Sequence, residues 1–432
     1  MNEKWLKRSV TWTALFLCFT KISVLGQTPT LTLDDCIRLA LEAPSTVRAA
    51  ALEELIAAER QTAARAELLP QLGLTSGYTY NSPVTNGPNP FSFVALNGVR
   101  EYLATAGTNW SLDLSGRLRA GLALARAGRD LASADLAVAR RDVRRAVTLA
   151  FYDVLLARQI FELEEGSLEE AREFERAVRA RREQGEASQA DVLKASAQRA
   201  QFEQRVGQAQ LDSRLANQML ASFWTTDVDR ELSLAGVLDS SVEPMPTAVG
   251  ERSEPEIRHR PELRRLDALS RTYDAQRAIA GAGLKPEASV VFQYGLDANQ
   301  VRADQRGYAA FVNVNVPVFD WFRSRSGVRE AKYRLEQVQQ ERVIAERTFS
   351  REYLAARARA QSWYGRIPLA EGELNAAREN LRLVRLLYVA GEGTALDVVL
   401  SQVQAAQAGR SFYSTVAEYR RALADFEVAA GL

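Results

Sequence analysis

A short pattern of glycine, hydroxyl residue and acid occurs twice in this chain at a spacing that can do local chemistry. Its members are Gly185, Ser188 and Asp191 in the first copy, and Gly391, Thr394 and Asp397 in the second. A glycine just past a helix accepts the left-handed backbone, and a hydroxyl side chain then caps the next helix. An acid three residues later completes a capping box. Each copy therefore predicts a tight helical hairpin in which the acid acts first as a cap.

Other patterns that would indicate catalysis are missing from the sequence. The one histidine, His259, has no nucleophile motif, phosphate loop or metal-ligand spacing around it, which favours a surface histidine. Paired carboxylates for glycan hydrolysis stay open, since 54 acids are present, but nothing selects a pair. Met219 and Met245 give no methionine relay for a metal. We expect neither an enzyme nor a bound cofactor.

The balance of charged residues limits the kinds of partner that the chain can bind. Lys and Arg number 55 against 54 Asp and Glu, so the formal net charge is +1. Nucleic-acid binding depends on a clear excess of basic side chains. We therefore expect no nucleic-acid partner.

The first 26 residues resemble a secretory signal peptide. Lys4, Lys7 and Arg8 precede an apolar run at 10–19, and Gly26 is a small residue suited to cleavage. Removal of residues 1–26 would leave Cys36 as the one cysteine, so an intramolecular disulfide is not expected. No later segment has 18 consecutive apolar residues, so any membrane contact would be made by strands.

The mature chain reads as two similar halves. Leu68-x-Pro70 with Tyr78 recurs as Leu284-x-Pro286 with Tyr294, and the two hairpin patterns also recur in the same order. We predict a first repeat at 27–224, a connector rich in Pro, Ser and Asp at 225–260, and a second repeat at 261–432. The connector is expected to lie outside the main helical wall.

Each half is predicted to contain a helix, two strands and a long helical hairpin. The expected helices cover 32–68 and 261–284, the strands 71–80, 104–114, 287–296 and 308–318, and the long helices 117–183 and 323–389, with tips at 185–188 and 391–394. Val291 and Phe311 break the alternation of apolar and polar residues in the strands, and Pro368 is the one proline within the second long helix. The loop at 81–101 is expected to be the larger loop at the cell surface.

Two environments suit these strands. A soluble sandwich would bury one face of each strand. The polar positions, however, carry Asn, Ser, Thr and Gly, and aromatic residues gather near the strand ends, as in membrane strands. Four strands are too few to close a barrel, because the smallest closed barrels have about eight. A membrane location therefore requires several copies of the chain.

The ordered motifs resemble the TolC-like outer-membrane efflux protein family. The resemblance rests on Leu31-Thr32-Leu33-Asp34-Asp35-Cys36 and the residues that follow it, on Pro317-Val318-Phe319-Asp320, and on the duplicated hairpins. It implies a mainly α fold with membrane β-strands, namely a homotrimer with a twelve-stranded β-barrel continued by a periplasmic α-helical barrel. Its implied partners are further copies of the chain, outer-membrane lipid, a periplasmic adaptor that docks on the hairpin tips, and an inner-membrane pump.

Two site residues follow from the resemblance alone. Asp397 corresponds to an acid that lines the closed periplasmic entrance, and Tyr388 to an aromatic residue that tethers the tip. The chain departs from the family at Leu400, where a second acid is common, and at Gly393, which replaces a basic residue. Ala190 also lacks a hydroxyl group.

The resulting hypothesis is a passive exit duct in the cell outer membrane, with a large periplasmic portion. It would serve a tripartite efflux or type I secretion system. The alternative is a periplasmic coiled-coil adaptor or scaffold, which explains the hairpins but not four strands of membrane length. The cargo, whether drug, metal ion, protein or another substrate, stays open.

Overall fold

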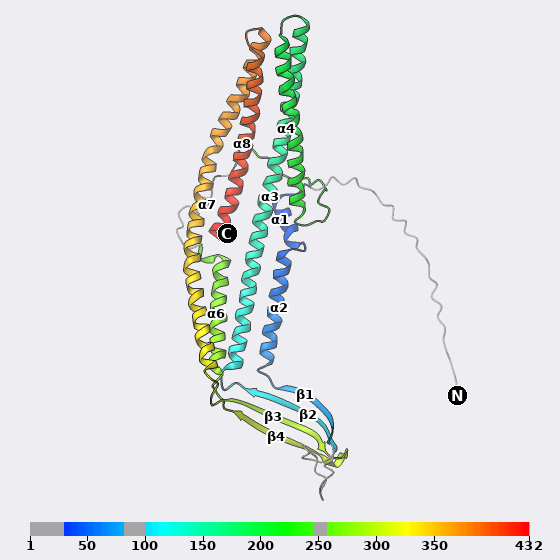
Figure 1. The fold of residues 1–432 in the computed structure, drawn as a ribbon, viewed down its shortest axis with the longest axis vertical. Coiled ribbons are helices and arrows are strands. Elements are labelled where there is room, and N and C mark those ends of the chain that lie inside the picture. The colour runs from blue at the N-terminus through cyan, green and yellow to red at the C-terminus, as the bar shows by residue number, and fades with distance from the viewer. Residues whose placement is uncertain (1–29, 82–99, 243, 245–256, 432) are drawn as a thin grey trace, which may run out of the picture.

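The computed structural model describes residues 30–81, 100–242, 244 and 257–431. The expected signal peptide and almost all of the expected surface loop at 81–101 lie outside the described residues. The chain forms a long rod, with a small sheet at one end and two helical hairpins at the other (Figure 1). The second half of the chain repeats the element order of the first half from the second helix onward.

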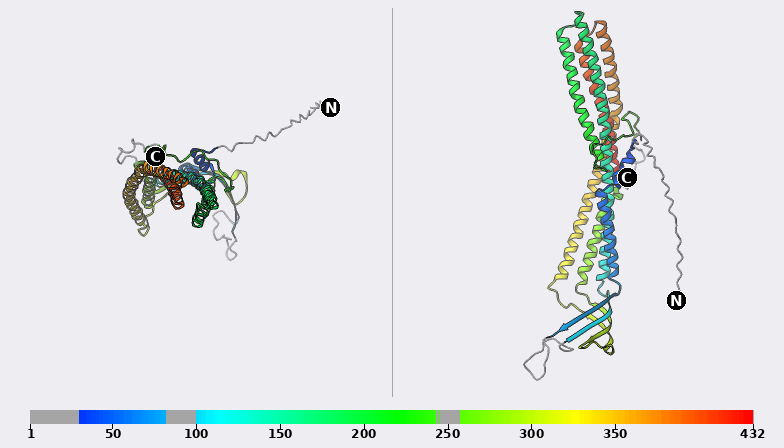
Figure 2. Two further views of the ribbon diagram at one scale, coloured as in Figure 1. Left: turned by 90° about the horizontal axis from the view of Figure 1, so that it is seen from above. Right: turned by 90° about the vertical axis from the view of Figure 1, so that its right-hand side faces the viewer.

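Long helices form most of the rod. They are α2 (Thr46–Ala66), α3 (Arg117–Glu183), α4 (Gln189–Ala221), α6 (Pro261–Ala282), α7 (Arg323–Ala390) and α8 (Ala395–Ala430). At about 1.5 Å per residue, α3 alone extends on the order of 100 Å. Seen from above, the helices follow a curved wall, with α1 and the described part of the connector on its convex side (Figure 2). None of the described helices has the length and hydropathy needed to cross a membrane.

The prediction of one helix over 32–68 is wrong. The structure divides it into α1 (Leu33–Glu42) and α2, and Ala43 between them has φ −67° and ψ 159°. Pro44 explains the break, because its ring disfavours the helical conformation of the preceding residue. α1 begins with a capping box between Thr32 and Asp35.

The second long helix is continuous through Pro368, as expected. α7 continues through it from Arg323 to Ala390. Proline removes one helical N–H bond, but α7 packs along α8 and buries Ile367 beside the proline. This tertiary packing stabilises the turn that the missing bond weakens.

The four strands form one antiparallel sheet in the order β1-β2-β3-β4, not the two sheets of a sandwich. Their bounds are Gln71–Tyr80, Arg100–Leu112, Glu287–Ala298 and Arg306–Asn315. β2 and β4 each begin and end earlier than expected. Pro317 has no N–H for a ladder hydrogen bond, which is consistent with the end of β4 at Asn315.

The register sorts the side chains into two contrasting faces. One face is mainly apolar, with Ser76 and Thr108 as polar exceptions, and includes Leu72, Leu74, Tyr102, Ala106, Phe292, Tyr308, Val312 and Val314. The other face carries Gln71, Thr75, Thr105, Asn109, Ser289, Gln293 and Asn313. Val291 and Phe311, which break the alternation, are cross-strand partners of each other on the polar face. The two exceptions therefore form one small apolar contact.

The main core lies halfway along the rod, where α1, α3, α4, α7 and α8 meet. The described part of the connector joins this core through Leu232 and Leu238, which are both buried. Leu31 N donates to Ser233 O at 2.7 Å, so the segment before α1 is paired to the connector as well. The connector is thus packed on the helical wall.

Candidate functional site

The two hairpin tips contain every site residue predicted from sequence. In the first tip, Gly185 has φ +80°, and Glu186 N donates to Arg181 O at 2.9 Å. Asp191 N then donates to Ser188 Oγ at 3.1 Å, and Ser188 N donates to Asp191 Oδ2 at 3.3 Å. These bonds form the reciprocal capping box that ends one helix and begins the next.

The second tip repeats this geometry. Gly391 has φ +81°, and Glu392 N donates to Leu387 O at 3.0 Å. Thr394 N donates to Asp397 Oδ2 at 3.1 Å, and Asp397 N donates to Thr394 Oγ1 at 3.2 Å. Both glycines occupy a backbone conformation that disfavours any residue with a Cβ.

The two capping acids differ in what lies beside the carboxylate oxygen that is not used for capping, Oδ1. Lys194 Nζ lies 3.2 Å from Asp191 Oδ1, whereas Leu400 occupies the matching position in the second tip. Hydrogen bonds from Ser188 and Lys194 lower the pKa of Asp191, and the Thr394 hydroxyl lowers the pKa of Asp397. Both acids are therefore ionised at neutral pH. Asp397 is exposed and has no basic partner in the described part of the chain.

Tyr388 connects the two hairpins. Its ring packs edge-on against Phe174 of α3 with centroids 5.1 Å apart, and the Arg181 guanidinium lies 4.8 Å above it. Arg181 Nη1 also donates to Tyr388 O at 2.6 Å, and Nη2 donates to Val389 O. Tyr388 is 8% exposed, so its ring is buried between the hairpins and does not face open solvent.

Sequence reasoning did not find Phe174 and Arg181. Their spacing of seven residues places both on one face of α3, which was the available signal. The partner on α7 is more than 200 residues away, and no local pattern indicates it. Gly393, predicted as a departure from the family, sits where a Cβ would come within 3.0 Å of Tyr388 N.

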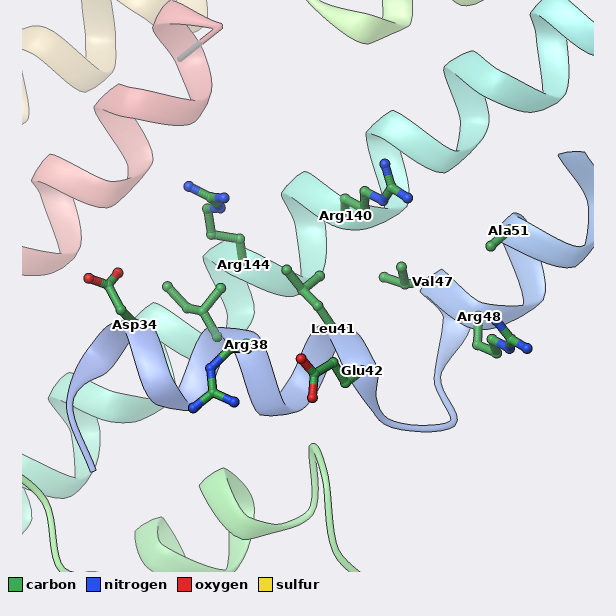
Figure 3. A pocket seen from close by; sticks show the side chains of 10 residues that line it. Asp34, Arg38, Leu41, Glu42, Val47, Arg48, Ala51, Arg140 and Arg144 are labelled. Carbon is green, nitrogen blue, oxygen red and sulfur yellow. The ribbon is translucent and has the colours of Figure 1, made fainter. Parts of the chain in front are cut away.

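A hollow lies near the middle of the rod, away from the hairpin tips. It has a volume of about 690 Å³ and is lined by α1, the first turns of α2, and Arg140 and Arg144 of α3. Figure 3 shows the guanidinium groups of Arg38, Arg140 and Arg144 pointing away from one another. Because these groups do not converge, the hollow is not built to hold an anion. Among the described residues, no group of three His, Cys, Asp or Glu side chains could hold a metal ion.

Comparison with known proteins agrees with this architecture. The chain is 27% identical to the cobalt-zinc-cadmium resistance protein CzcC of Cupriavidus metallidurans over 330 residues, which is 73% of this chain and 74% of that protein. The CmeC outer membrane channel of Campylobacter jejuni superposes with a TM-score of 0.83 at 16% identity, covering 92% of this chain and 85% of that one. The open-state MtrE channel of Neisseria gonorrhoeae gives 0.79 at 21%, covering 92% and 88%.

The family assignment rests on a model that covers most of the chain. The model of the outer membrane efflux proteins matches residues 36–225 and 255–431. This match favours the channel hypothesis over the adaptor or scaffold alternative, and it indicates a transport family, not an enzyme family. The chain belongs to the outer membrane efflux protein family, as an outer-membrane channel with a large periplasmic helical part that acts in tripartite efflux.

Proposed function

We propose that three copies of this chain close one duct, with a twelve-stranded β-barrel in the outer membrane and an α-helical barrel in the periplasm. Family membership alone does not give the number of chains in the duct or the closing of the sheet into a barrel, and we propose both. One observation carries it: the sheet is open, with β1 and β4 as edge strands, and one of its faces is mainly apolar.

The open edges argue for neighbouring copies. Lipid offers no hydrogen-bond partners to the backbone, so a sheet within a bilayer must be closed. Leu72 is 87% exposed and Tyr308 is 78% exposed on the apolar face, as lipid-facing residues would be. β4 of one copy can pair with β1 of the next in antiparallel order, because the number of strands is even. Three copies give a barrel wide enough for a channel.

Like the sheet, the helical wall is open, with two edges that no other part of the described chain covers. Figure 1 places α7 at one edge of the wall and α2 with α4 at the other. Both edges carry exposed apolar side chains, among them Leu55 of α2, Met219 of α4, and Leu354 and Leu369 of α7. Apolar stripes of this kind are typical of protein interfaces. A neighbouring copy would bury both edges at once.

We also propose that the hairpin tips dock the periplasmic adaptor, which in turn links the duct to the inner-membrane pump. Gly185, Ser188 and Asp191 would present one tip, and Gly391, Thr394 and Asp397 the other. The support is their fixed and nearly identical capping geometry at the end of the rod farthest from the sheet. Tyr388 and Asp397 would form the periplasmic gate, with Arg181 holding Tyr388 in place.

A heavy-metal cargo is the third part of the proposal. Its support is the 27% identity to a cobalt-zinc-cadmium resistance protein over most of both chains. A passive duct needs no metal ligands of its own, because selection belongs to the pump. Deletion of the gene should increase sensitivity to zinc, cobalt and cadmium more than to organic drugs. The opposite order would remove metals as the cargo and leave the duct proposal intact.

The trimer is tested by the mass of the assembly. We expect the mature protein, purified in detergent, to give a protein mass of three chains by light scattering after subtraction of the detergent. A monodisperse monomer that is stable in water without detergent would contradict the proposal.

A further inference from the structure

The junction between β4 and α7 has an unusual backbone. Trp321 and Phe322 have φ values of 55° and 64°, and they are the described non-glycine residues with positive φ. Phe322 is the N-cap of α7. At the matching junction of the first half, the N-cap of α3 is Gly116 with φ 81° and ψ 7°, close to the 64° and 14° of Phe322. The same turn is therefore built once with glycine and once with bulky aromatic residues.

The left-handed backbone conformation disfavours residues with a Cβ. Residues strained in this way are found mainly at functional sites. Here the side chains form an exposed aromatic cluster. The Phe319 ring lies edge-on to Trp321 at 5.0 Å and to Phe322 at 5.8 Å. Val318 is 91% exposed and Trp321 is 84% exposed. A cluster this exposed contributes little to the core of its own chain.

Two arginines follow the cluster, and they also differ between the halves. Arg117 and Arg119 correspond to Arg323 and Arg325 at the 206-residue offset that relates Gly185 to Gly391 (391 − 185). In the first half, Arg117 Nε binds Glu287 Oε1 at 2.7 Å and Arg119 Nε binds Asp113 Oδ2 at 2.8 Å.

In the second half, neither guanidinium has a hydrogen bond or ion pair within the described part of the chain. Arg323 and Arg325 are both exposed. Two cations beside an exposed aromatic cluster therefore remain available to a ligand outside this chain.

The distance along the sheet places this junction at the edge of the membrane. Tyr308, Tyr294 and Tyr102 mark the opposite end of the apolar face. Val318 lies ten positions beyond Tyr308 in the sequence. At about 3.3 Å per residue and a tilt of about 40°, the part of this segment in β4, Tyr308 to Asn315, spans roughly 18 Å, and residues 316–318 continue it toward the height of about 25 Å of the apolar band of an outer-membrane barrel. The helices lie beyond this end, which is therefore the periplasmic leaflet.

We propose that residues 318–325 form a phospholipid headgroup site in the periplasmic leaflet of the outer membrane. The aromatic cluster sits at the level of the headgroups, where tryptophan is favoured, and Arg323 and Arg325 bind lipid phosphates. The site depends on the membrane location of the sheet and not on the cargo or the adaptor. The matching junction of the first half lacks both features, so the site occurs once in each chain.

The first experiment compares matched double variants. The mature protein, Arg323→Gln/Arg325→Gln and Arg117→Gln/Arg119→Gln are titrated with phosphatidylglycerol in detergent, and bound lipid is counted by native mass spectrometry. We expect affinity to fall about fivefold for each arginine removed from the second junction, with no change in the first-junction control. Inorganic phosphate should not compete. Equal lipid binding by all three proteins, or competition by free phosphate, would overturn the proposal.

The second experiment follows the aromatic cluster. Wild-type protein and Trp321→Phe are placed in vesicles that contain phospholipids brominated at different depths, and the difference in tryptophan fluorescence is measured. The proposal expects strongest quenching of Trp321 by bromine nearest the headgroup. Absence of quenching at all depths would overturn it. So would a loss of trimers in Arg323→Gln/Arg325→Gln with unchanged lipid affinity, because the arginines would then bind a neighbouring copy.

Discussion

Lys194 lies 3.2 Å from Asp191 in the first hairpin, and Leu400 replaces it beside Asp397 in the second. The charge of Asp191 is therefore partly balanced within the chain, whereas that of Asp397 is not. Three copies of Asp397 around one axis would concentrate a negative field at the narrow periplasmic entrance and favour cations. Asp397 also caps its helix, so the capping role alone is the alternative explanation.

Single-channel recordings in planar bilayers separate these roles. Asp397→Asn should lower the preference for cations, while Asp191→Asn should lower it much less. Block by divalent cations should be weaker than in relatives with two acidic rings, because Leu400 leaves fewer carboxylates to hold the ion. Identical selectivity in wild type and both variants would leave Asp397 with capping alone.

The contact of Arg181 with Tyr388 should hold the entrance closed. Arg181→Ala removes two donated hydrogen bonds and a cation–π contact, together worth about 2 kcal/mol. We expect larger conductance or more frequent opening in bilayer recordings. Arg182→Ala is the control, because Arg182 bonds to Gln189 of its own hairpin. Equal opening in the two variants would show that the contact with Tyr388 does not restrain the gate.

The hairpin glycines should be intolerant of branched residues. Gly185→Val or Gly391→Val forces a β-branched side chain into the left-handed conformation, at roughly 1–2 kcal/mol for each site. We expect deformed tips, weaker adaptor crosslinking and impaired export, with normal insertion into the membrane. Val389→Gly, at an exposed position nearby, tests for general fragility of the tip. Normal export in both glycine variants would argue against docking at the tips.

Cys36 should resist alkylation in the folded protein. It is 0% exposed, and burial raises the pKa of its thiol to about 11. The thiol is therefore protonated and inaccessible at neutral pH. A maleimide reagent should modify Cys36 only after denaturation, as measured by mass spectrometry. Rapid labelling of the native protein would contradict the packing of α1 on the core.

Much of the architecture could be predicted from local patterns. The caps of both hairpins and the length of the long helices follow from residue spacing, because these interactions span few residues. Pro44 itself was a local signal for the break between α1 and α2, but the prediction extended one helix across it. The contacts of Tyr388 could not be predicted, since Phe174 and Arg181 reach it through packing between distant helices. Likewise, Val291 and Phe311 break the alternation of apolar and polar residues, and only the register of β3 with β4 shows that they are paired.

Crosslinking between the two edge strands tests the closed duct most directly. Thr75 lies on β1 and Ala309 on β4, so a double cysteine variant at these positions places one thiol at each edge of the sheet. Single variants serve as controls, and buried Cys36 should not react. With a flexible bifunctional maleimide on intact cells, we expect covalent dimers and trimers of the double variant and no larger species. Monomers alone, or a ladder that extends beyond three chains, would contradict it.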